Sequence, residues 1–381
     1  MEQVLSKLRG IADQPYEYLR QWKQENGRKI IGCMPMYVPE ELIHAAGMLP
    51  VVLQKTDEEI EQGPSNVQSY FCGIVRCIGE MIQEHKLDWM DGIVSPDTCL
   101  AIRGLSNIAR MHKREGEYHF DLVLPLSIKN KAAEPYLRAQ LAKFKATLED
   151  HFGVKIENEA LRRSIGVFNE NRALLRQIYA LRRDNPALIS AADLSSVVLA
   201  SMVMPKEEHS VLARELIGGL QKKQASAGDA VKIVLSGSLC EFPTREILDL
   251  IEEAGCTVVG DDLYTGGRYI NADLATDGDP MAAIVHRHLN MVIPCPTRFD
   301  QGRDLGSYLI DLVKANRAEG VIFLIVKFCQ PHDMHHPFAS DKLDDAGIPS
   351  MVIETEYEMP SVGQVKTRVQ AFLEMLRRNT Q

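Results

Sequence analysis

The chain of 381 residues is 45% hydrophobic and 25% charged, and its formal net charge is −9 at pH 7. This composition indicates a globular protein of two or three domains, and an acidic chain with no basic run argues against nucleic acid as a partner. No apolar run approaches the ~18 residues that span a bilayer, and the polar start lacks signal-peptide character, so we expect a cytoplasmic protein that does not bind membranes. Disulfides are rare in that compartment, so the eight cysteines are expected to be reduced thiols, metal ligands or catalytic groups.

Strands and helices alternate in the first third of the chain, after one or two N-terminal helices that end near Arg28. The expected elements are, in order, a strand at 29–33, a helix at 40–46 that ends at Gly47, a strand at 48–53, a helix at 72–85, a strand at 92–95, a helix at 97–114 with Asp97 or Thr98 as its N-cap, and a strand at 118–124. This alternation predicts a parallel sheet covered by helices.

Only helical periodicity is found from Ala133 to about Ala227, with breaks at Pro186 and Pro205. The alternation then restarts, with strands expected at 231–237, 257–259, 320–326 and 351–355 and helices at 245–254, 280–289, 304–318 and 362–377. We therefore predict an α/β protein with two parallel-sheet lobes: 1–130 form the N-terminal helices and the first lobe, 131–229 a helical region, and 230–381 the second lobe.

Several cysteines stand where these predicted strands end. Cys33, Cys99, Cys240 and Cys329 each follow a strand, and Cys72 opens a helix. Strand exits and helix starts share one edge of a βα unit, which is where open α/β sheets bind ligands, so several thiolates can converge there. The other cysteines are predicted to be structural: Cys77 inside a helix, Cys256 at a strand start and Cys295 between two prolines.

The spacing of these cysteines leaves two interpretations open. A mononuclear zinc site usually shows close Cys-x-x-Cys pairs, and this sequence has none. Widely spaced single cysteines instead suit an iron–sulfur cluster held between domains. The competing interpretation is a set of scattered core thiols, because unpaired cysteines are often buried.

Other polar residues are weaker candidates. The histidine-rich segment 331–336 follows Cys329 directly and is predicted as a turn whose imidazoles donate protons or bind metal, or else as a solvated loop. His44, on the short helix after Pro39, either faces the crevice or is a core histidine. Arg268 lies in a glycine-containing loop and either meets a phosphate of a substrate carrier or plays no special role. No nucleotide-binding glycine motif is present.

Six segments, in this order, carry a family resemblance: Met34–Pro50, Gln68–Cys72, Ser95–Cys99, Gly260–Gly266, Lys327–Cys329 and Gly363–Arg368. With them the sequence resembles the benzoyl-CoA reductase and 2-hydroxyacyl-CoA dehydratase family from about Trp22 to Leu376. The resemblance implies two Rossmann-like lobes with a helical region and one [4Fe–4S] cluster between the lobes. It implies Cys72, Cys99 and Cys329 as ligands, with Cys240 as a possible fourth.

The resemblance also implies partners and a reaction. Such a subunit pairs with a larger homologous cluster-bearing subunit, and an ATP-hydrolysing iron–sulfur activator dimer supplies low-potential, ferredoxin-derived electrons. The segments around Tyr37 and Cys99 favour the smaller subunit of ATP-dependent benzoyl-CoA reductase, which reduces benzoyl-CoA by two electrons to a cyclic diene thioester. His332 and His44 are then candidate proton donors, and Arg268 a candidate contact for a CoA phosphate.

Alternatives within and outside the family remain. Three alternatives are a subunit of a 2-hydroxyacyl-CoA dehydratase, an electron-relay subunit whose partner binds the acyl-CoA, and a metal-free scaffold. Dehydratases show an acidic Cys-Asp-Pro-Glu segment, whereas this chain has Cys-Gln-Pro-His at 329–332. That difference disfavours the dehydratase.

Overall fold

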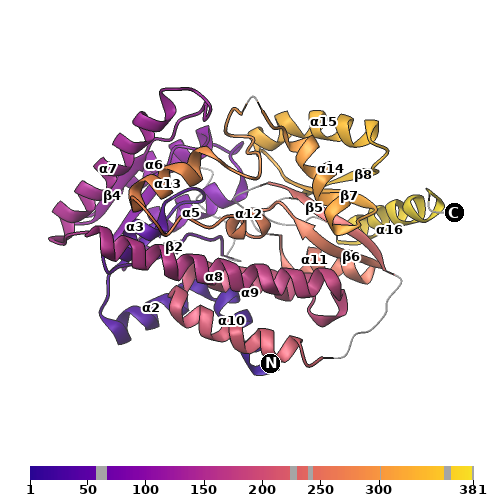
Figure 1. Ribbon diagram of the computed structural model, residues 1–381, viewed down its shortest axis with the longest axis horizontal. Helices are drawn as coiled ribbons and strands as arrows, with labels where there is room; N and C mark the ends of the chain where they lie inside the picture. The colour runs from indigo at the N-terminus through magenta and orange to yellow at the C-terminus, as the bar shows by residue number, and fades with distance from the viewer. Residues whose placement is uncertain (57–66, 224–229, 239–242, 301, 356–361, 380–381) are drawn as a thin grey trace.

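The computed structural model describes residues 1–56, 67–223, 230–238, 243–300, 302–355 and 362–379. The first lobe contains β1 (Ile30–Cys33), α3 (Glu40–Ala45), β2 (Leu49–Val52), α5 (Gly73–Gln83), β3 (Gly92–Pro96), α6 (Leu100–Met111) and β4 (Tyr118–Leu122). Two helices precede it, α1 (Glu2–Asp13) and α2 (Pro15–Asn26). Its four strands are all parallel, in the order β2-β1-β3-β4. Figure 1 shows this lobe beside the second one.

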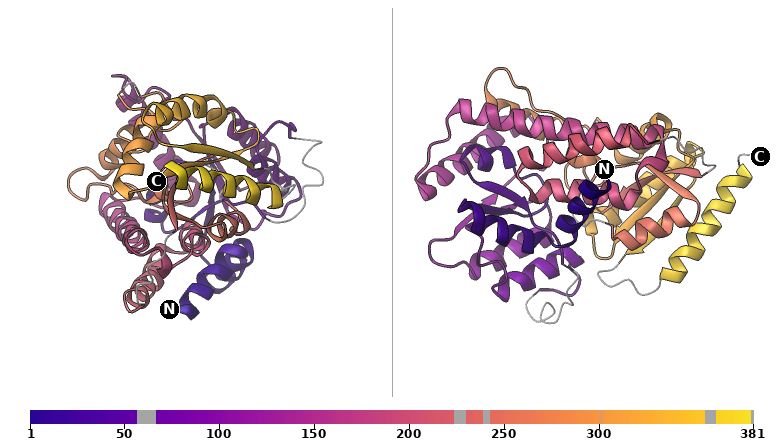
Figure 2. Two further views of the ribbon diagram at one scale, coloured as in Figure 1. Left: turned by 90° about the vertical axis from the view of Figure 1, so that its right-hand side faces the viewer. Right: turned by 90° about the horizontal axis from the view of Figure 1, so that it is seen from below.

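A helical region separates the two lobes in the sequence. It consists of α7 (Ala133–Phe152), α8 (Asn158–Asp184), the short 3₁₀ helix η1 (Pro186–Leu188), α9 (Ala191–Val203) and α10 (Lys206–Leu220). The 27-residue helix α8 runs along both lobes, in contact with α3 of the first and with a strand of the second (Figures 1 and 2). The region therefore acts as a brace between the lobes.

The second lobe repeats the plan of the first. It contains β5 (Val231–Gly237), α11 (Arg245–Glu253), β6 (Cys256–Asp261), α12 (Gly267–Ile270), α13 (Pro280–Leu289), α14 (Leu305–Asn316), β7 (Gly320–Val326), α15 (Gln330–Asp345), β8 (Ser350–Thr355) and α16 (Val362–Asn379). Its strands are parallel, in the order β6-β5-β7-β8. The predicted α/β class, with two parallel-sheet lobes, N-terminal helices and a helical insert, is confirmed.

Both sheets are covered by helices on both faces, as their apolar strands require. Successive side chains of a strand point to opposite faces, so in β7 Val321 and Phe323 pack against α14 and α15, whereas Ile322 and Leu324 pack against α11 and α16. Every residue of β7 is buried. In the first lobe the same rule sends Ile30 to the side of α5 and α6 and Ile31 to the side of α3 and α7.

The strand order of each sheet decides where ligands can bind. In the first sheet β2 lies on one side of β1 and β3 lies on the other, so the direction of strand addition reverses at β1. In the second sheet β6 and β7 flank β5 in the same way. In such sheets the crevice lies beyond the carboxyl ends of the strands at this switch point. Within the described residues no helix is both long and apolar enough to cross a bilayer.

Candidate functional site

Three of the predicted ligands line one cavity. Cys72 and Cys99 reach it from the first lobe and Cys329 from the second, and its volume is about 390 Å³. Much of the remaining lining is apolar or aromatic, and includes Met36, Tyr70, Phe71, Leu100, Phe328 and Met334. We call this space the cysteine cavity. The folded chain thus brings together residues that lie far apart in the sequence, as the strand-end argument predicted.

Each of these cysteines is the N-cap of a helix: Cys72 of α5, Cys99 of α6 and Cys329 of α15. Burial is the largest influence on the pKa of the Cys99 and Cys329 thiols and raises it, while the N–H groups of Ala101 and Ile102 lower the pKa of Cys99 and the N–H of His332 lowers the pKa of Cys329. The N-terminus of a helix carries partial positive charge and unpaired N–H groups. Three such ends therefore favour thiolate or another anion in the cavity. The expected N-caps Asp97 and Thr98 were wrong, because the helix begins after Cys99.

Burial works against the anionic form when no metal is bound. Burial raises the pKa of the Cys329 thiol to about 11, and burial also raises the pKa of Cys99. Both groups are therefore protonated at pH 7 in the metal-free protein. Binding of a metal would release these protons, as thiolate ligation does generally.

The donor set fits an iron–sulfur cluster better than a single ion. Among the described residues, no group of three or more His, Cys, Asp or Glu side chains could hold one metal ion. A four-iron cluster spreads its ligands over a wider space than one ion does. The three thiols that line this cavity of about 390 Å³ are of the ligand type that holds iron–sulfur clusters, the cysteine thiolate.

The backbone before Cys329 adopts an uncommon conformation. Phe328 has φ 68°, in the left-handed region, and its side chain is exposed. Bulky residues rarely adopt positive φ, and such strain persists where the surrounding structure demands it. Here it turns the chain sharply between the end of β7 and the start of α15. Cys329 is consequently delivered to the cavity wall.

His332 lines the same cavity, three residues after Cys329. Its side chain is buried, and its Nε2 has no hydrogen-bond partner among the described residues. Burial, together with the nearby Arg268 charge, lowers the pKa of His332 to about 3, so the imidazole is neutral at pH 7. The expected histidine-rich turn was wrong: residues 331–336 form the first turns of α15, which tolerates Pro331 at its start.

Of the other predicted site residues, His44 is placed away from the cavity. His44 lies on α3, where its Nδ1 is 2.9 Å from the Ser164 hydroxyl and its Nε2 is 3.1 Å from Glu207. It does not line the cysteine cavity, so its role as a proton donor stays a prediction. Cys240 lies outside the described residues, and its role as fourth ligand likewise stays a prediction.

The remaining cysteines are buried in the cores. Cys33 ends β1, Cys77 lies inside α5, Cys256 begins β6, and Cys295 is hydrogen-bonded to the Thr297 hydroxyl at 3.0 Å. None of the four lines the cysteine cavity. The seven cysteines in the described part of the chain form no disulfide.

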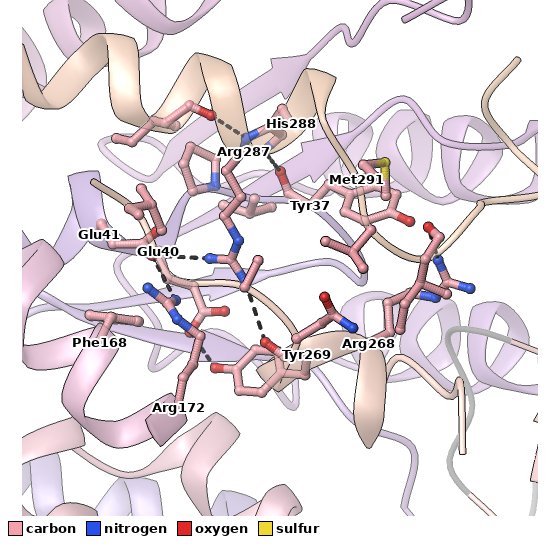
Figure 3. Close-up of a pocket in the computed structure, with 18 of the residues that line it drawn as sticks. Tyr37, Glu40, Glu41, Phe168, Arg172, Arg268, Tyr269, Arg287, His288 and Met291 are labelled. Atoms are coloured by element: carbon pink, nitrogen blue, oxygen red, sulfur yellow. Dashed lines mark hydrogen bonds and ion pairs between the residues drawn. The ribbon is translucent and has the colours of Figure 1, made fainter. Parts of the chain in front are cut away.

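Arg268 lines a second, smaller pocket of about 90 Å³, which we call the junction pocket (Figure 3). Its guanidinium donates to the carbonyl oxygens of Ile293 and Pro294, both at 2.9 Å, and lies 3.8 Å from an oxygen of Asp262. Arg268 is buried by these contacts. A contact with a CoA phosphate stays a prediction. It would require the Arg268 side chain to break its contacts with Ile293, Pro294 and Asp262.

A buried ionic network crosses the junction pocket, and the sequence interpretation missed it. Glu41 accepts from Arg172 of α8 at 2.9 Å and from Arg287 of α13 at 3.3 Å, while Tyr269 of α12 donates to Glu40 at 2.9 Å (Figure 3). The network therefore fastens α3 of the first lobe to the helical region and the second lobe. The available signal was the Pro-Glu-Glu sequence at 39–41, two acidic residues that open an otherwise apolar helix.

Comparison with known proteins gives a consistent result. Residues 35–376 match the family described as 2-hydroxyglutaryl-CoA dehydratase, D-component. The chain is 34% identical to a benzoyl-CoA reductase subunit of Thauera aromatica, over 88% of each chain. It is 31% identical to the beta subunit of lactoyl-CoA dehydratase from Anaerotignum propionicum, over 99% of each chain. It is 29% identical to the beta subunit of (R)-2-hydroxyglutaryl-CoA dehydratase from Acidaminococcus fermentans, over 98% of this chain and 99% of that one. The chain therefore belongs to the 2-hydroxyglutaryl-CoA dehydratase D-component family, together with these benzoyl-CoA reductase and dehydratase subunits.

Proposed function

We propose that this chain is the smaller iron–sulfur subunit of an ATP-dependent benzoyl-CoA reductase. The observation that carries the proposal is the cysteine cavity, in which Cys72, Cys99 and Cys329 cap three helices from two lobes. These three thiolates would hold a [4Fe–4S] cluster, with Cys240 as the candidate fourth ligand. A cluster bound there supplies single electrons at low potential.

The overall reaction adds two electrons and two protons to benzoyl-CoA and gives a cyclohexadiene-carbonyl-CoA. In this chain the apolar wall around the cysteines, including Met36 and Phe71, would exclude water from the reacting ring. His332 is the candidate proton donor at the cavity. Its neutral imidazole can give an N–H proton only to a strongly basic ring carbon, so protonation would follow electron uptake rather than precede it.

The benzoyl-CoA assignment is supported by two features. The chain is 34% identical to a benzoyl-CoA reductase subunit, and the segment after Cys329 is Gln-Pro-His rather than the acidic form of dehydratases. The second candidate is a subunit of a 2-hydroxyacyl-CoA dehydratase. It is favoured by the beta subunit of lactoyl-CoA dehydratase, which aligns with this chain over 99% of its length.

The proposal includes partners. The relatives are named as subunits of larger enzymes, which supports a heteromeric assembly with a larger homologous cluster-bearing subunit. An ATP-hydrolysing iron–sulfur activator dimer, supplied by ferredoxin, would deliver the electrons. Whether the acyl group lies at this chain or at its partner separates a catalytic role from an electron relay.

The test of the ligand set is the iron and acid-labile sulfide content of anaerobically prepared variants. Cys72→Ser, Cys99→Ser and Cys329→Ser should each lose cluster, whereas Cys256→Ser is the matched control and should retain it with modest destabilisation. Cys240→Ser then decides the fourth ligand. Full iron and sulfide in any of the first three variants would remove that cysteine from the ligand set.

The test of the reaction uses the complex reconstituted with its partner and activator. Consumption of benzoyl-CoA with formation of the diene thioester is the expected result. Turnover of a 2-hydroxyacyl-CoA with benzoyl-CoA left untouched would replace the reductase assignment with the dehydratase.

A further inference from the structure

Aromatic side chains from both lobes line the cysteine cavity. Tyr70 and Phe71 belong to the first lobe, and Phe328 belongs to the second. The side chains of Tyr70 and Phe328 are 48% and 38% exposed, whereas Phe71 is only 6% exposed. Of these three rings, Phe71 is therefore the one whose position is fixed by the protein packed around it.

The ring of Phe71 lies against α6 at Gly104. A Cβ added to Gly104 would be 2.8 Å from Cε2 and 3.3 Å from Cζ of the ring. Carbon atoms in contact ordinarily lie about 3.5–4.0 Å apart, so a larger residue at 104 would displace the ring. Glycine is a poor residue for a helix interior, and the space that the ring needs accounts for it here. The Tyr70 ring also meets the Phe71 ring edge to face, with centroids 5.4 Å apart.

We infer that Phe71 is a specificity-determining residue that selects an aromatic acyl group in the cysteine cavity. This inference rests on the proposed function, and it places the acyl group at this chain rather than at its partner subunit. Aromatic rings in edge-to-face or offset contact attract each other beyond the effect of buried area. A saturated acyl group buries apolar area against Phe71 but lacks that attraction.

Phe71 precedes the proposed ligand Cys72, so a purely structural role for the ring has to be separated from recognition. The N–H of Phe71 donates to the carbonyl oxygen of Gln68 at 3.0 Å. This hydrogen bond belongs to the backbone turn that leads to Cys72, and it does not involve the ring. A variant that shortens the ring should therefore keep the turn, and with it the cluster.

The experiment measures the binding of two CoA thioesters to the oxidised, cluster-loaded complex by equilibrium dialysis. Benzoyl-CoA and cyclohexane-carbonyl-CoA carry rings of six carbons, and only the first ring is aromatic. Wild-type complex should bind benzoyl-CoA more tightly. Phe71→Leu should retain iron and sulfide, and should lower the preference for benzoyl-CoA by about twofold to tenfold.

Gly104→Ala gives a second test that leaves Phe71 in the chain. The new Cβ displaces the ring, so the preference for benzoyl-CoA should fall here as well. In a Phe71→Leu background the same change should have no further effect, because leucine lacks the Cε2 and Cζ atoms that the Cβ would meet. The matched control is Gly166→Ala in α8, where an added Cβ has no atom within 4 Å and the preference should stay at the wild-type value.

The outcomes separate this inference from the proposed function. Equal losses of affinity for both thioesters in Phe71→Leu overturn the inference, because the ring would then supply only buried area. Unchanged affinities in Phe71→Leu and Gly104→Ala overturn it too, since the acyl group would lie elsewhere, and so does a Phe71→Leu protein that folds without iron. In each case a wild-type complex that reduces benzoyl-CoA leaves the proposed function standing. Wild-type, cluster-loaded complex that neither binds nor reduces benzoyl-CoA overturns both.

Discussion

Replacing Glu41 by glutamine should destabilise the protein by about 3–5 kcal/mol, the range found when one partner of a buried ion pair is removed. Glu41 is the shared acceptor of Arg172 at 2.9 Å and Arg287 at 3.3 Å, and the side chains of Glu41 and Arg172 are each 5% exposed. Glutamine keeps the shape but leaves two guanidinium groups facing each other without this counter-charge. Their proximity already matters, because burial and the Arg172 charge lower the pKa of Arg287 to about 10.

The measurement is thermal and urea unfolding of the variant beside its control. For 381 residues, an unfolding entropy of about 2.1 cal/mol/K per residue converts this loss into a fall in Tm of roughly 4–6 °C. The control is Glu207→Gln, the same substitution at a side chain that is 55% exposed and pairs with His44, for which a loss of at most about 1 kcal/mol is expected. Equal losses for the two variants would refute the reasoning.

The same pair predicts a pH dependence. Burial alone would raise the pKa of Glu41, but the charges of Arg172 and Arg287 lower it below its usual value. The ionised form of Glu41 is therefore favoured more in the folded state than in the unfolded state. Its contribution to stability is present above the unfolded pKa and is lost as pH falls through the folded pKa. Glu41→Gln should remove this part of the loss of folding stability at acidic pH.

Two further predictions concern single buried positions. Gly237→Ala should destabilise the second lobe, because the added Cβ would lie 2.0 Å from the backbone of Leu324. The control Gly10→Ala has no atom within 4 Å of its Cβ and should stabilise α1 by up to about 1 kcal/mol. Equal urea midpoints for the two variants would contradict this prediction. Burial lowers the pKa of His209 to about 3, so the unfolded chain binds a proton below its own pKa near 6.5 while the folded chain does not. Stability should fall by about 1.4 kcal/mol per pH unit between these values, and His209→Gln should flatten that slope in urea titrations at pH 6, 5 and 4.

Local patterns in the sequence were sufficient for the elements and for the candidate ligands. The apolar run 320–326 is a strand buried on both faces, as its composition requires, and Cys99 and Cys329 follow strands at the same edge of their sheets. These features depend on short stretches of chain, where periodicity, glycine and proline dominate. Helix starts were less certain: a cysteine rather than Asp97 or Thr98 caps α6, because the backbone enters the helix later than the polar side chains suggested.

Contacts between distant segments were decided only by the tertiary structure. Nothing local to Pro39-Glu-Glu indicates that Glu41 will meet Arg172 and Arg287, which lie 131 and 246 positions away. Likewise, the Ser238 hydroxyl accepts a hydrogen bond from the N–H of Val326 because Gly237 lets β5 approach β7. Such pairings depend on how two lobes pack against a shared helical brace, and packing is a property of the whole chain rather than of any segment.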